Sequence, residues 1–473
     1  MRLTKNYQVY VNEKPLSLQP MRVSKMPFNR HWPGYQRSLD QTEVTAFASF
    51  EITQKITVRI VCDFEFQTVA IKPSSLGIIP ELSQRTVTFT LDKPCQTVVE
   101  FDGTLGALHL FANPPEQPIS LTENDLCFAP GVHEVGRITP KSGQTIYLAE
   151  GAVVYGEIYA EDVENVTICG RGILDHSKIQ PDTSCEGFID PPRPSPIEIR
   201  YSKNIVLRDI VVRDPCFLAV RPICCEDVCI DNIKIVGCWR YNSDGIDLIN
   251  CRRGIIKNCF VRTFDDSLCL KGFHFPFQGE MFYKHRTYDT MEDIVFENCV
   301  VWNEWGNALH IGIDLCAKEI KNCTFRNCDV IHSCYSVLNI STVDYAEIFD
   351  IVYDDIRVEY DDVSQKPLIQ ESDEDIFVPN PDSTYMPTLF LLKLYQDAYS
   401  CGGVKRGKIN NVTFRNIQVT APRMPPSLLL GYSEENAIRG ITFEDIYLNG
   451  EKSTDADALN LRPEAFVYDM KIK

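Results

Sequence analysis

The 473-residue sequence predicts an all-β protein, in which a small N-terminal β-sandwich domain precedes a right-handed parallel β-helix, a solenoid. Two observations support this fold class. Residues 1–115 contain short strand-like segments separated by turns, and residues 116–473 contain a strand-like repeat. The predicted domains are therefore 1–115, sandwich-like, and 116–473, the β-helix that would carry the catalytic site.

The segment 1–115 is rich in Val, Thr and aromatic residues, with partial alternation of apolar and polar side chains. Such alternation is typical of half-buried strands. Regular short strands with Pro, Gly and Asn between them favour a β-sandwich. The stretch 111–118 (FANPPEQP) follows, and its prolines stiffen the chain and stop strand pairing. The domain boundary is therefore placed there.

The repeat is represented by NIVLRDIVV from Asn204 and NVTFRNIQV from Asn411, each with an Asn or Asp before its second apolar position. Those second positions are Ile210, Ile233, Cys259, Cys299, Cys328, Ile356, Ile417 and Ile446. Five of the seven steps between them lie between 23 and 29 residues. That is short for a βαβ unit, which needs ~30 or more residues, and no amphipathic helical stretch intervenes.

These steps fit coils of a parallel β-helix, in which equivalent side chains stack along the interior. The Asn or Asp suits a bend, because these residues tolerate left-handed backbone. A solenoid of helical repeats is the alternative, and the bias toward Val, Ile, Thr and Phe opposes it.

The 19 cysteines are an odd number, so they cannot all pair within the chain. No CxxC pairs with a second CxxC or with two histidines at zinc spacing. Cys259, Cys299 and Cys328 stand where other copies have Ile, and Cys323 stands where others have Ile or Val. We expect these four to be core residues. The first residues lack the apolar core of a secretory signal peptide, which predicts a cytoplasmic protein with reduced thiols.

The net charge of the protein limits the kinds of partner that it is expected to bind. A net charge of −18 argues against nucleic acid or an anionic membrane surface. No apolar run approaches the ~20 residues of a transmembrane helix. We therefore expect neither nucleic acid nor a membrane as partner.

Three segments depart from the repeat, namely 242–247 (NSDGID), 264–272 (FDDSLCLKG) and 302–312 (WNEWGNALHIG). Asp244 precedes Asp265 and Asp266 by 21 and 22 residues, about one coil, which would stack their carboxylates on one face. Crowded carboxylates raise at least one pKa. Glycoside hydrolysis uses such a pair, one as acid and one to activate water.

The alternative is that these aspartates have no catalytic role and lie in solvent-exposed turns. Three carboxylates at one-coil spacing disfavour this alternative. Asp247 either joins the site or braces the turn.

These motifs resemble those of the polygalacturonase family of glycoside hydrolases, family 28, and of its clan relatives, the family 49 dextranases. The family pattern is Asn-Thr-Asp-Gly-x-Asp, then Gly-Asp-Asp one coil later, then Gly-His-Gly and Arg-Ile-Lys. Here Ser243 replaces Thr, and Phe264 replaces the Gly before the Asp pair. The similarity covers about 151–449, and the N-terminal segment looks like the sandwich that precedes the helix in dextranases.

The resemblance implies an inverting hydrolase that needs no metal or other cofactor. By match to the motif, Asp265 is the general acid. Asp244 and Asp266 position and activate the water. The expected partner is an oligosaccharide substrate.

Two departures concern the later motifs. Asn307 stands at the family histidine, and His310, three residues further, either substitutes for that histidine or is a core residue. The Arg-Ile-Lys motif, which grips substrate carboxylates in the family, has no counterpart around residues 337–340. A neutral or differently charged sugar is therefore an option beside polygalacturonate.

Other candidate substrate groups follow from position. Trp302 and Trp305 are suited to stacking on sugar faces, and we expect one of the two to be a buried aromatic. Lys271 either bonds to the sugar or pairs with a site Asp. The predicted substrate-binding set is Asn242, Asp247, Lys271, Trp302, Trp305, Asn307 and His310.

Two insertions, at 273–291 and about 359–407, are expected on the working face of the solenoid. They would narrow a groove into a pocket, which favours exo action on pectin-derived or related plant or microbial glycans. Two other hypotheses stay open. One is a β-helix polysaccharide lyase with calcium and a basic residue, and the other is a non-catalytic carbohydrate-binding β-helix. The sequence leaves the sugar, the linkage and the oligomeric state open.

Overall fold

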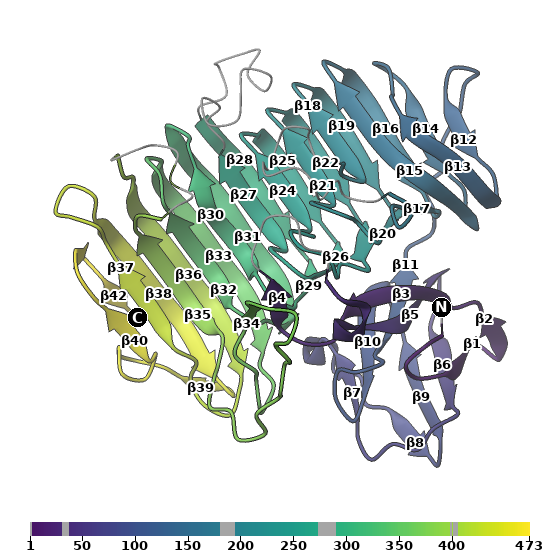
Figure 1. Cartoon of the computed structure of the whole chain (residues 1–473), viewed down its shortest axis with the longest axis horizontal. Coiled ribbons are helices and arrows are strands. Elements are labelled where there is room, and N and C mark those ends of the chain that lie inside the picture. Colours follow the sequence, from purple (N-terminus) through teal and green to yellow (C-terminus); the bar gives the residue numbers. More distant parts are fainter. Residues whose placement is uncertain (1, 31–36, 180–193, 273–289, 398–399, 401–404) are drawn as a thin grey trace. The chain divides into compact units, whose positions relative to one another are not determined.

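The computed structural model describes residues 2–30, 37–179, 194–272, 290–397, 400 and 405–473 (Figure 1). They form two compact units, one of Met1–Met26 with Ser38–Glu123 and one of Pro27–Arg37 with Asn124–Lys473. The short segment 27–37 thus groups with the C-terminal unit although unit 1 flanks it in sequence. The predicted domain boundary at residue 115 stays a prediction. No helix in the described ranges is long and apolar enough to cross a membrane.

Unit 1 contains two five-stranded sheets with a shared core. Apolar side chains from both sheets, such as Val58 and Leu110, meet in that core, as in a sandwich. The first sheet contains β2 (Lys14–Leu16), β1 (Tyr7–Val11), β6 (Ile56–Cys62), β9 (Thr86–Leu91) and β8 (Glu81–Ser83). The second contains β3 (Gln19–Ser24), β5 (Thr42–Glu51), β11 (Leu108–Asn113), β10 (Cys95–Phe101) and β7 (Val69–Lys72). Short 3-10 turns lie at Leu39–Gln41 and Ser74–Leu76.

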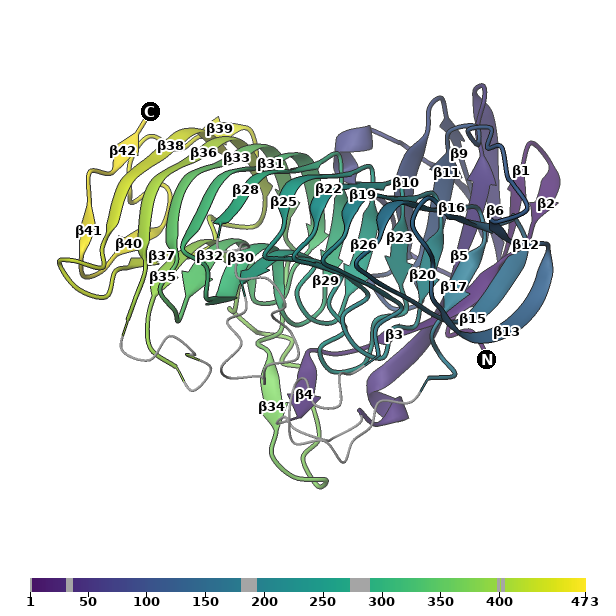
Figure 2. The same ribbon diagram turned by 90° about the horizontal axis from the view of Figure 1, so that it is seen from above.

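Unit 2 is the predicted parallel β-helix, in which each coil adds strands to three ladders (Figure 2). The first half of each repeat segment lies in the first ladder, and its end lies past the bend in the second. The first ladder contains β12 (Leu126–Phe128), β14 (Thr145–Leu148), β16 (Glu164–Gly170), β19 (Lys203–Arg208), β22 (Glu226–Asp231), β25 (Arg252–Lys257), β28 (Thr290–Glu297), β31 (Glu319–His332), β33 (Glu347–Glu359), β36 (Lys408–Thr420) and β38 (Ile438–Leu448).

The second ladder contains β17 (Ile173–Asp175), β20 (Val211–Arg213), β23 (Lys234–Val236), β26 (Phe260–Thr263) and β29 (Val300–Asn303), and continues in the ends of β31, β33 and β36. The third contains β18 (Ile197–Arg200), β21 (Val220–Ile223), β24 (Ile246–Ile249), β27 (Leu268–Gly272), β30 (Asn307–Leu315), β32 (Ser336–Thr342), β35 (Thr388–Leu394), β37 (Ser427–Leu430) and β40 (Leu461–Pro463).

The remaining strands lie at the edges of the β-helix. At the N-terminal end β13 (Gly131–Ile138) pairs in parallel with β15 (Ala152–Glu161) of the next coil, and β15 in turn pairs with β17 and β18. The last strands are β39 (Glu451–Lys452), β41 (Val467–Tyr468) and β42 (Lys471–Ile472). A separate two-stranded sheet pairs β4 (Phe28–Arg30) in parallel with β34 (Leu368–Gln370), so segment 27–37 is hydrogen-bonded to the second predicted insertion (Figures 1 and 2). Residues 273–289 of the first predicted insertion lie outside the described residues.

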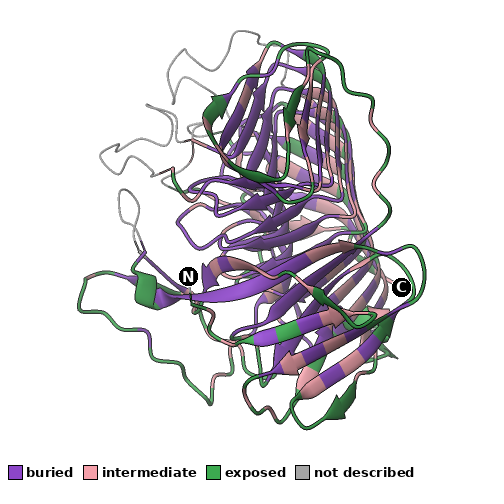
Figure 3. Cartoon of the chain, turned by 90° about the vertical axis from the view of Figure 1, so that its right-hand side faces the viewer, coloured by how far each residue is buried: buried purple, intermediate pink, exposed green. Residues whose placement is uncertain are grey.

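The repeat register predicted from the sequence sets the core. Cys328, Ile356, Ile417 and Ile446 pair directly along the first ladder and are almost completely buried. Figure 3 shows that buried residues predominate along the stacked strands. The Asn or Asp before each such position has positive φ, for example 56° at Asn258. These residues therefore make the bends that turn each coil. The predicted all-β fold class is confirmed.

The cysteines largely follow the same register. Sixteen described cysteines are free thiols, and Cys316 takes part in a disulfide. Cys259, Cys299, Cys323 and Cys328, the four predicted core positions, are all buried. Burial raises the pKa of Cys299 well above its ordinary value and that of Cys323 to about 12. Both should therefore be thiols, not thiolates, at neutral pH.

We predict that iodoacetamide modifies exposed Cys127 in the native protein but leaves Cys299 and Cys323 unmodified, because alkylation requires an accessible thiolate. Peptide mapping by mass spectrometry measures each site. Unfolding in urea should make all three reactive. Rapid modification of Cys299 before unfolding would contradict its place in the stacked core.

Candidate active site

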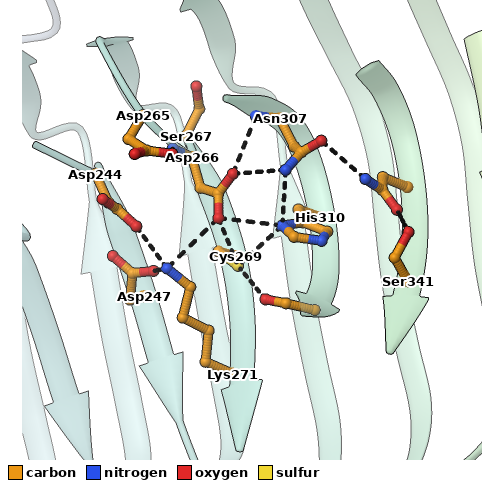
Figure 4. Close-up of polar contacts among 12 residues, drawn as sticks. Asp244, Asp247, Asp265, Asp266, Ser267, Cys269, Lys271, Asn307, His310 and Ser341 are labelled. Atoms are coloured by element: carbon orange, nitrogen blue, oxygen red, sulfur yellow. Dashed lines mark hydrogen bonds and ion pairs between the residues drawn. The ribbon is translucent and has the colours of Figure 1, made fainter. Parts of the chain in front are cut away.

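One outward face of the third ladder carries a row of polar side chains. Asp247 of β24 pairs in register with Cys269 of β27, which pairs with His310 of β30, which pairs with Asn339 of β32. Successive side chains on a strand point to opposite faces, so neighbours such as Leu268 fill the core while these four face outward. Figure 4 shows Asp247, Cys269 and His310 beside Asp244, Asp265 and Asp266, which lie in the turns that precede β24 and β27.

Those two turns carry the three predicted catalytic aspartates. The Gly245 N–H donates to the Asp266 carbonyl at 2.8 Å, which holds the two turns in adjacent coils. One carboxylate oxygen from each of Asp244, Asp265 and Asp266 lies within 4.8 Å of the others. The one-coil spacing in the sequence therefore does bring these carboxylates together.

Gly306 allows the next coil to close on the aspartate pair. A Cβ at this position would lie 2.6 Å from Asp265 Oδ1 and 2.7 Å from the Asp266 nitrogen. The Asp265 side chain could move away, but the contact with the Asp266 nitrogen is with backbone and could not be relieved in that way. Glycine at 306 is therefore required where β30 approaches the site.

Lys271 lies at the centre of the carboxylates. Its Nζ is 2.5 Å from Asp244 Oδ2, 2.9 Å from Asp247 Oδ1 and 3.5 Å from Asp266 Oδ2. Burial alone would lower the pKa of this lysine, but Asp244 and Asp247 outweigh burial and raise the pKa well above its ordinary value. The ammonium is therefore charged. Lys271 pairs with site aspartates, one of the two roles left open by the sequence.

The carboxylates on either side of Lys271 respond to burial. Burial raises the pKa of Asp247 to about 6, against the opposing charge of Lys271. Burial also raises the pKa of Asp244 well above its ordinary value, again opposed by Lys271 and supported by the charges of Asp247 and Asp266. The charge of Lys271 is therefore not enough to keep the pKa values of both neighbouring carboxyl groups at or below their ordinary value.

Asp266 is the exception in this cluster. Its Oδ1 accepts hydrogen bonds from the Asn307 backbone nitrogen at 3.0 Å and from Asn307 Nδ2 at 2.8 Å. His310 Nδ1 lies 3.2 Å from Oδ2. Burial would raise the pKa of Asp266, but the charges of His310 and Lys271 and these hydrogen bonds hold it well below its usual range. Both candidates for the missing family histidine therefore contact the same carboxylate.

Asp265 has the opposite balance. Burial, and then the negative charges of Asp244 and Asp266, raise its pKa well above the ordinary value, while Lys271 only partly opposes them. Its backbone carbonyl accepts hydrogen bonds from Thr263 Oγ1 and Asn303 Nδ2, both at 2.7 Å. Adjacent residues in one turn are thus set to opposite protonation states.

The remaining predicted residues lie around this cluster. Trp302 is buried, with the Arg262 guanidinium carbon 3.7 Å from its ring centroid. Trp305 is half-buried and stacks on Phe264, with centroids 5.8 Å apart. Asn242 is half-buried in the turn before Asp244, with φ of 49°. Trp305 is therefore the tryptophan with surface available to a ligand.

Three residues of the site were not predicted. The Cys269 sulfur lies 3.6 Å from His310 Nδ1 and accompanies the row of polar side chains. Asn307 Oδ1 accepts from Ser336 Oγ at 2.6 Å and from Asn339 Nδ2 at 2.8 Å, which fixes the orientation of its amide. Their in-register position one coil from a predicted residue was the available signal.

Two sets of ligand-type atoms lie close enough to surround a cation, namely Asp244, Asp265 and Asp266, and Asp266, Cys269 and His310. The Lys271 ammonium already supplies positive charge to Asp244 and Asp266. Burial raises the pKa of the Cys269 thiol well above its ordinary value, which disfavours the thiolate that binds metals. The donor set therefore suits acid–base chemistry, and neither set is assigned to a metal.

Comparison with known proteins agrees with this chemistry. Residues 145–373 match the family described as glycosyl hydrolases family 28. A search of curated proteins found no match.

Two solved structures have a similar fold. Dex49A from Penicillium minioluteum is 14% identical, with a TM-score of 0.65 over 100% of this chain and 94% of its own. A hyperthermoactive exopolygalacturonase from Thermotoga maritima is 17% identical, with a TM-score of 0.53 over 73% of this chain and 84% of its own. The family match covers the aspartate turns, so it confirms the predicted resemblance to family 28 and supports a glycoside hydrolase, while the two solved structures share the fold of this chain.

Proposed function

We propose that this chain hydrolyses glycosidic bonds in oligosaccharides, with Asp265 as general acid and Asp266 as general base. The feature that supports this most directly is the difference in the surroundings of two adjacent carboxyl groups, since burial and neighbouring negative charges raise the pKa of Asp265, whereas positive charges and hydrogen bonds lower that of Asp266. Pairs of carboxyl groups separated in this way are typical of acid and base partners in glycosidases.

In the proposed reaction Asp265 gives its proton to the glycosidic oxygen as the bond to the anomeric carbon breaks. Asp266 accepts a proton from the water that attacks this carbon, with Asp244 orienting the water. The departing sugar leaves as an alcohol, and exchange with solvent restores both carboxyl groups. Lys271 keeps a positive charge near Asp265, which becomes negative as it gives up its proton, and Lys271 binds no substrate directly.

The stereochemical outcome is part of the proposal. Nearest oxygens of the three aspartates lie within 4.8 Å, below the ~6.5–9.5 Å usual between the carboxyl groups of inverting enzymes and near the ~5–5.5 Å of retaining ones. The family resemblance implies inversion, which we adopt. Inversion here requires that the water lie beside the carboxylates, held by Asp244 and Asp266 together, and not between acid and base.

For the substrate we propose exo action on short pectin-derived or related oligosaccharides, with a neutral sugar favoured at the bond that is cleaved. Lys271 lies within ion-pair distance of Asp244, Asp247 and Asp266 (Figure 4). Its charge is therefore already paired within the protein before any substrate carboxylate arrives. The sequence lacks the Arg-Ile-Lys clamp. The exopolygalacturonase from Thermotoga maritima has a similar fold, so exo action is compatible with this fold.

We predict that Asp265→Asn lowers kcat by at least about 10²–10⁴-fold, because the amide cannot donate the proton. The melting temperature should not fall, since the substitution also removes a carboxyl group from a crowded cluster. Turnover is measured on a panel of uronic, glucan, galactan and rhamnose-containing oligosaccharides. Undiminished hydrolysis by this variant would overturn the assignment.

We also predict that Asn307→Ala moves the acid limb of the pH–rate profile to higher pH. The wild-type carboxylate of Asp266 has a lowered pKa, so activity is lost only as pH falls through that low value. Removing the Nδ2 donor raises the pKa and moves the loss upward. Asn298→Ala, which removes an amide hydrogen-bonded to Asn258 at the coil bend, is the matched control and should leave the limb in place.

NMR of the first product formed is expected to show the anomer opposite to that of the substrate. Retention would replace the proposed water activation by a covalent intermediate. An unsaturated product, lost on adding EDTA, would instead indicate a lyase, and sugar binding without any product would indicate a binding protein.

A further inference from the structure

Phe264, the residue directly before the proposed acid, contacts two side chains that are distant from each other in sequence. The Arg37 guanidinium carbon lies 4.0 Å from its ring centroid. The Trp305 ring stacks on it at an interplanar angle of 17°. Phe264 is fully buried, and Trp305 is half-buried. Phe264 therefore takes part in a stack of three planar groups beside the acid.

Arg37 is the last residue of the segment Pro27–Arg37, which groups with the β-helix. It is 3% exposed, and its Nη1 donates to the Trp239 carbonyl at 3.2 Å. Burial lowers its pKa to about 10, opposed by the charges of Glu304 and Tyr241, so the guanidinium is charged at neutral pH. Burying a charge is costly unless it is compensated, and the Phe264 face supplies part of that compensation.

The turn that Phe264 shares with Asp265 is held from several sides. The Phe264 carbonyl accepts from the Gly306 nitrogen at 3.2 Å. The Asp265 carbonyl accepts from Thr263 and Asn303. These bonds fix the backbone of the turn, in which the Phe264 ring is fully buried and Asp265 is half-buried. The Arg37 guanidinium lies over the Phe264 ring.

We propose that Arg37 is a positioning residue for the reaction, acting through Phe264 to hold the Asp265 turn and to keep water away from the acid. Arg37 touches no reacting atom in this arrangement. The inference rests on the proposed role of Asp265. It also gives a physical role to the Phe that stands where the family motif has Gly.

The charged groups that face Asp265 itself are Asp244, Asp266 and Lys271, and burial is the largest influence on its pKa. Loosening the stack would admit water and lower that pKa toward its ordinary value. Since the acid must be protonated to act, the alkaline limb of the kcat–pH profile would then move to lower pH.

The test is Arg37→Ala in the full chain. We expect kcat to fall by about 10–100-fold, as small displacements at a reacting group do, with KM changed less than about 3-fold. The alkaline limb should move to lower pH. Arg37→Lys keeps a cation over the ring and should restore most of the limb position.

Arg439→Ala is the matched control, because Arg439 also lies over an aromatic ring, that of Tyr468, at 4.2 Å. It should change neither kcat nor the limb. If Arg37→Ala does not fold, Phe264→Leu gives the same readout, since it keeps an apolar side chain but removes the aromatic face.

If Arg37→Ala loses activity but the alkaline limb of its kcat–pH profile does not move, Arg37 has only a structural role and the inference is overturned. Full activity of Arg37→Ala would overturn it as well. The proposed function fails separately, if Asp265→Asn retains turnover and its alkaline limb.

Discussion

Four carboxyl groups lie close together around one buried ammonium group, with one histidine beside them, and this excess of acidic groups is the constraint on which the site depends. Lys271 contacts Asp244, Asp247 and Asp266, while Asp265 lies beside them without a cation of its own. Since buried like charges cannot all ionise, the cluster must retain protons. Hydrogen bonds then decide which carboxyl groups retain a proton. Asn307 and His310 form hydrogen bonds with Asp266, which favours the ionised form of that group.

The β-helix makes this crowding possible because its coils lie in register. Hydrogen bonds between backbones fix the spacing of adjacent coils, so aspartates about one coil apart in sequence must meet. The repulsion between them is opposed by hydrogen bonds across the turns, such as that from Gly245 to Asp266. The fold therefore supplies the rigidity that a set of perturbed acids requires, and the side chains only select which of them carries the charge.

Much of this could be read from the sequence. Repeat positions such as Ile356 and Cys328 indicated the stacked core, and the spacing of Asp244 and Asp265 indicated the cluster. The sequence left open whether Asn307 or His310 replaces the family histidine, because both choices fit the pattern. The structure places both against Asp266, which only the geometry of β30 could show. Arg37 was missed, since its contact with Phe264 joins segments far apart in the chain.

The segment Pro27–Arg37 bears on how such a protein can evolve. It lies between two stretches of the N-terminal unit, yet it belongs to the β-helix unit and supplies β4 and Arg37. Recombination at a single point near residue 123 would exchange the sandwich and this strip of the hydrolase at once. A sandwich exchanged at that point would carry segment 27–37 with it, so the replacement would have to supply its own β4 and Arg37 to the β-helix unit.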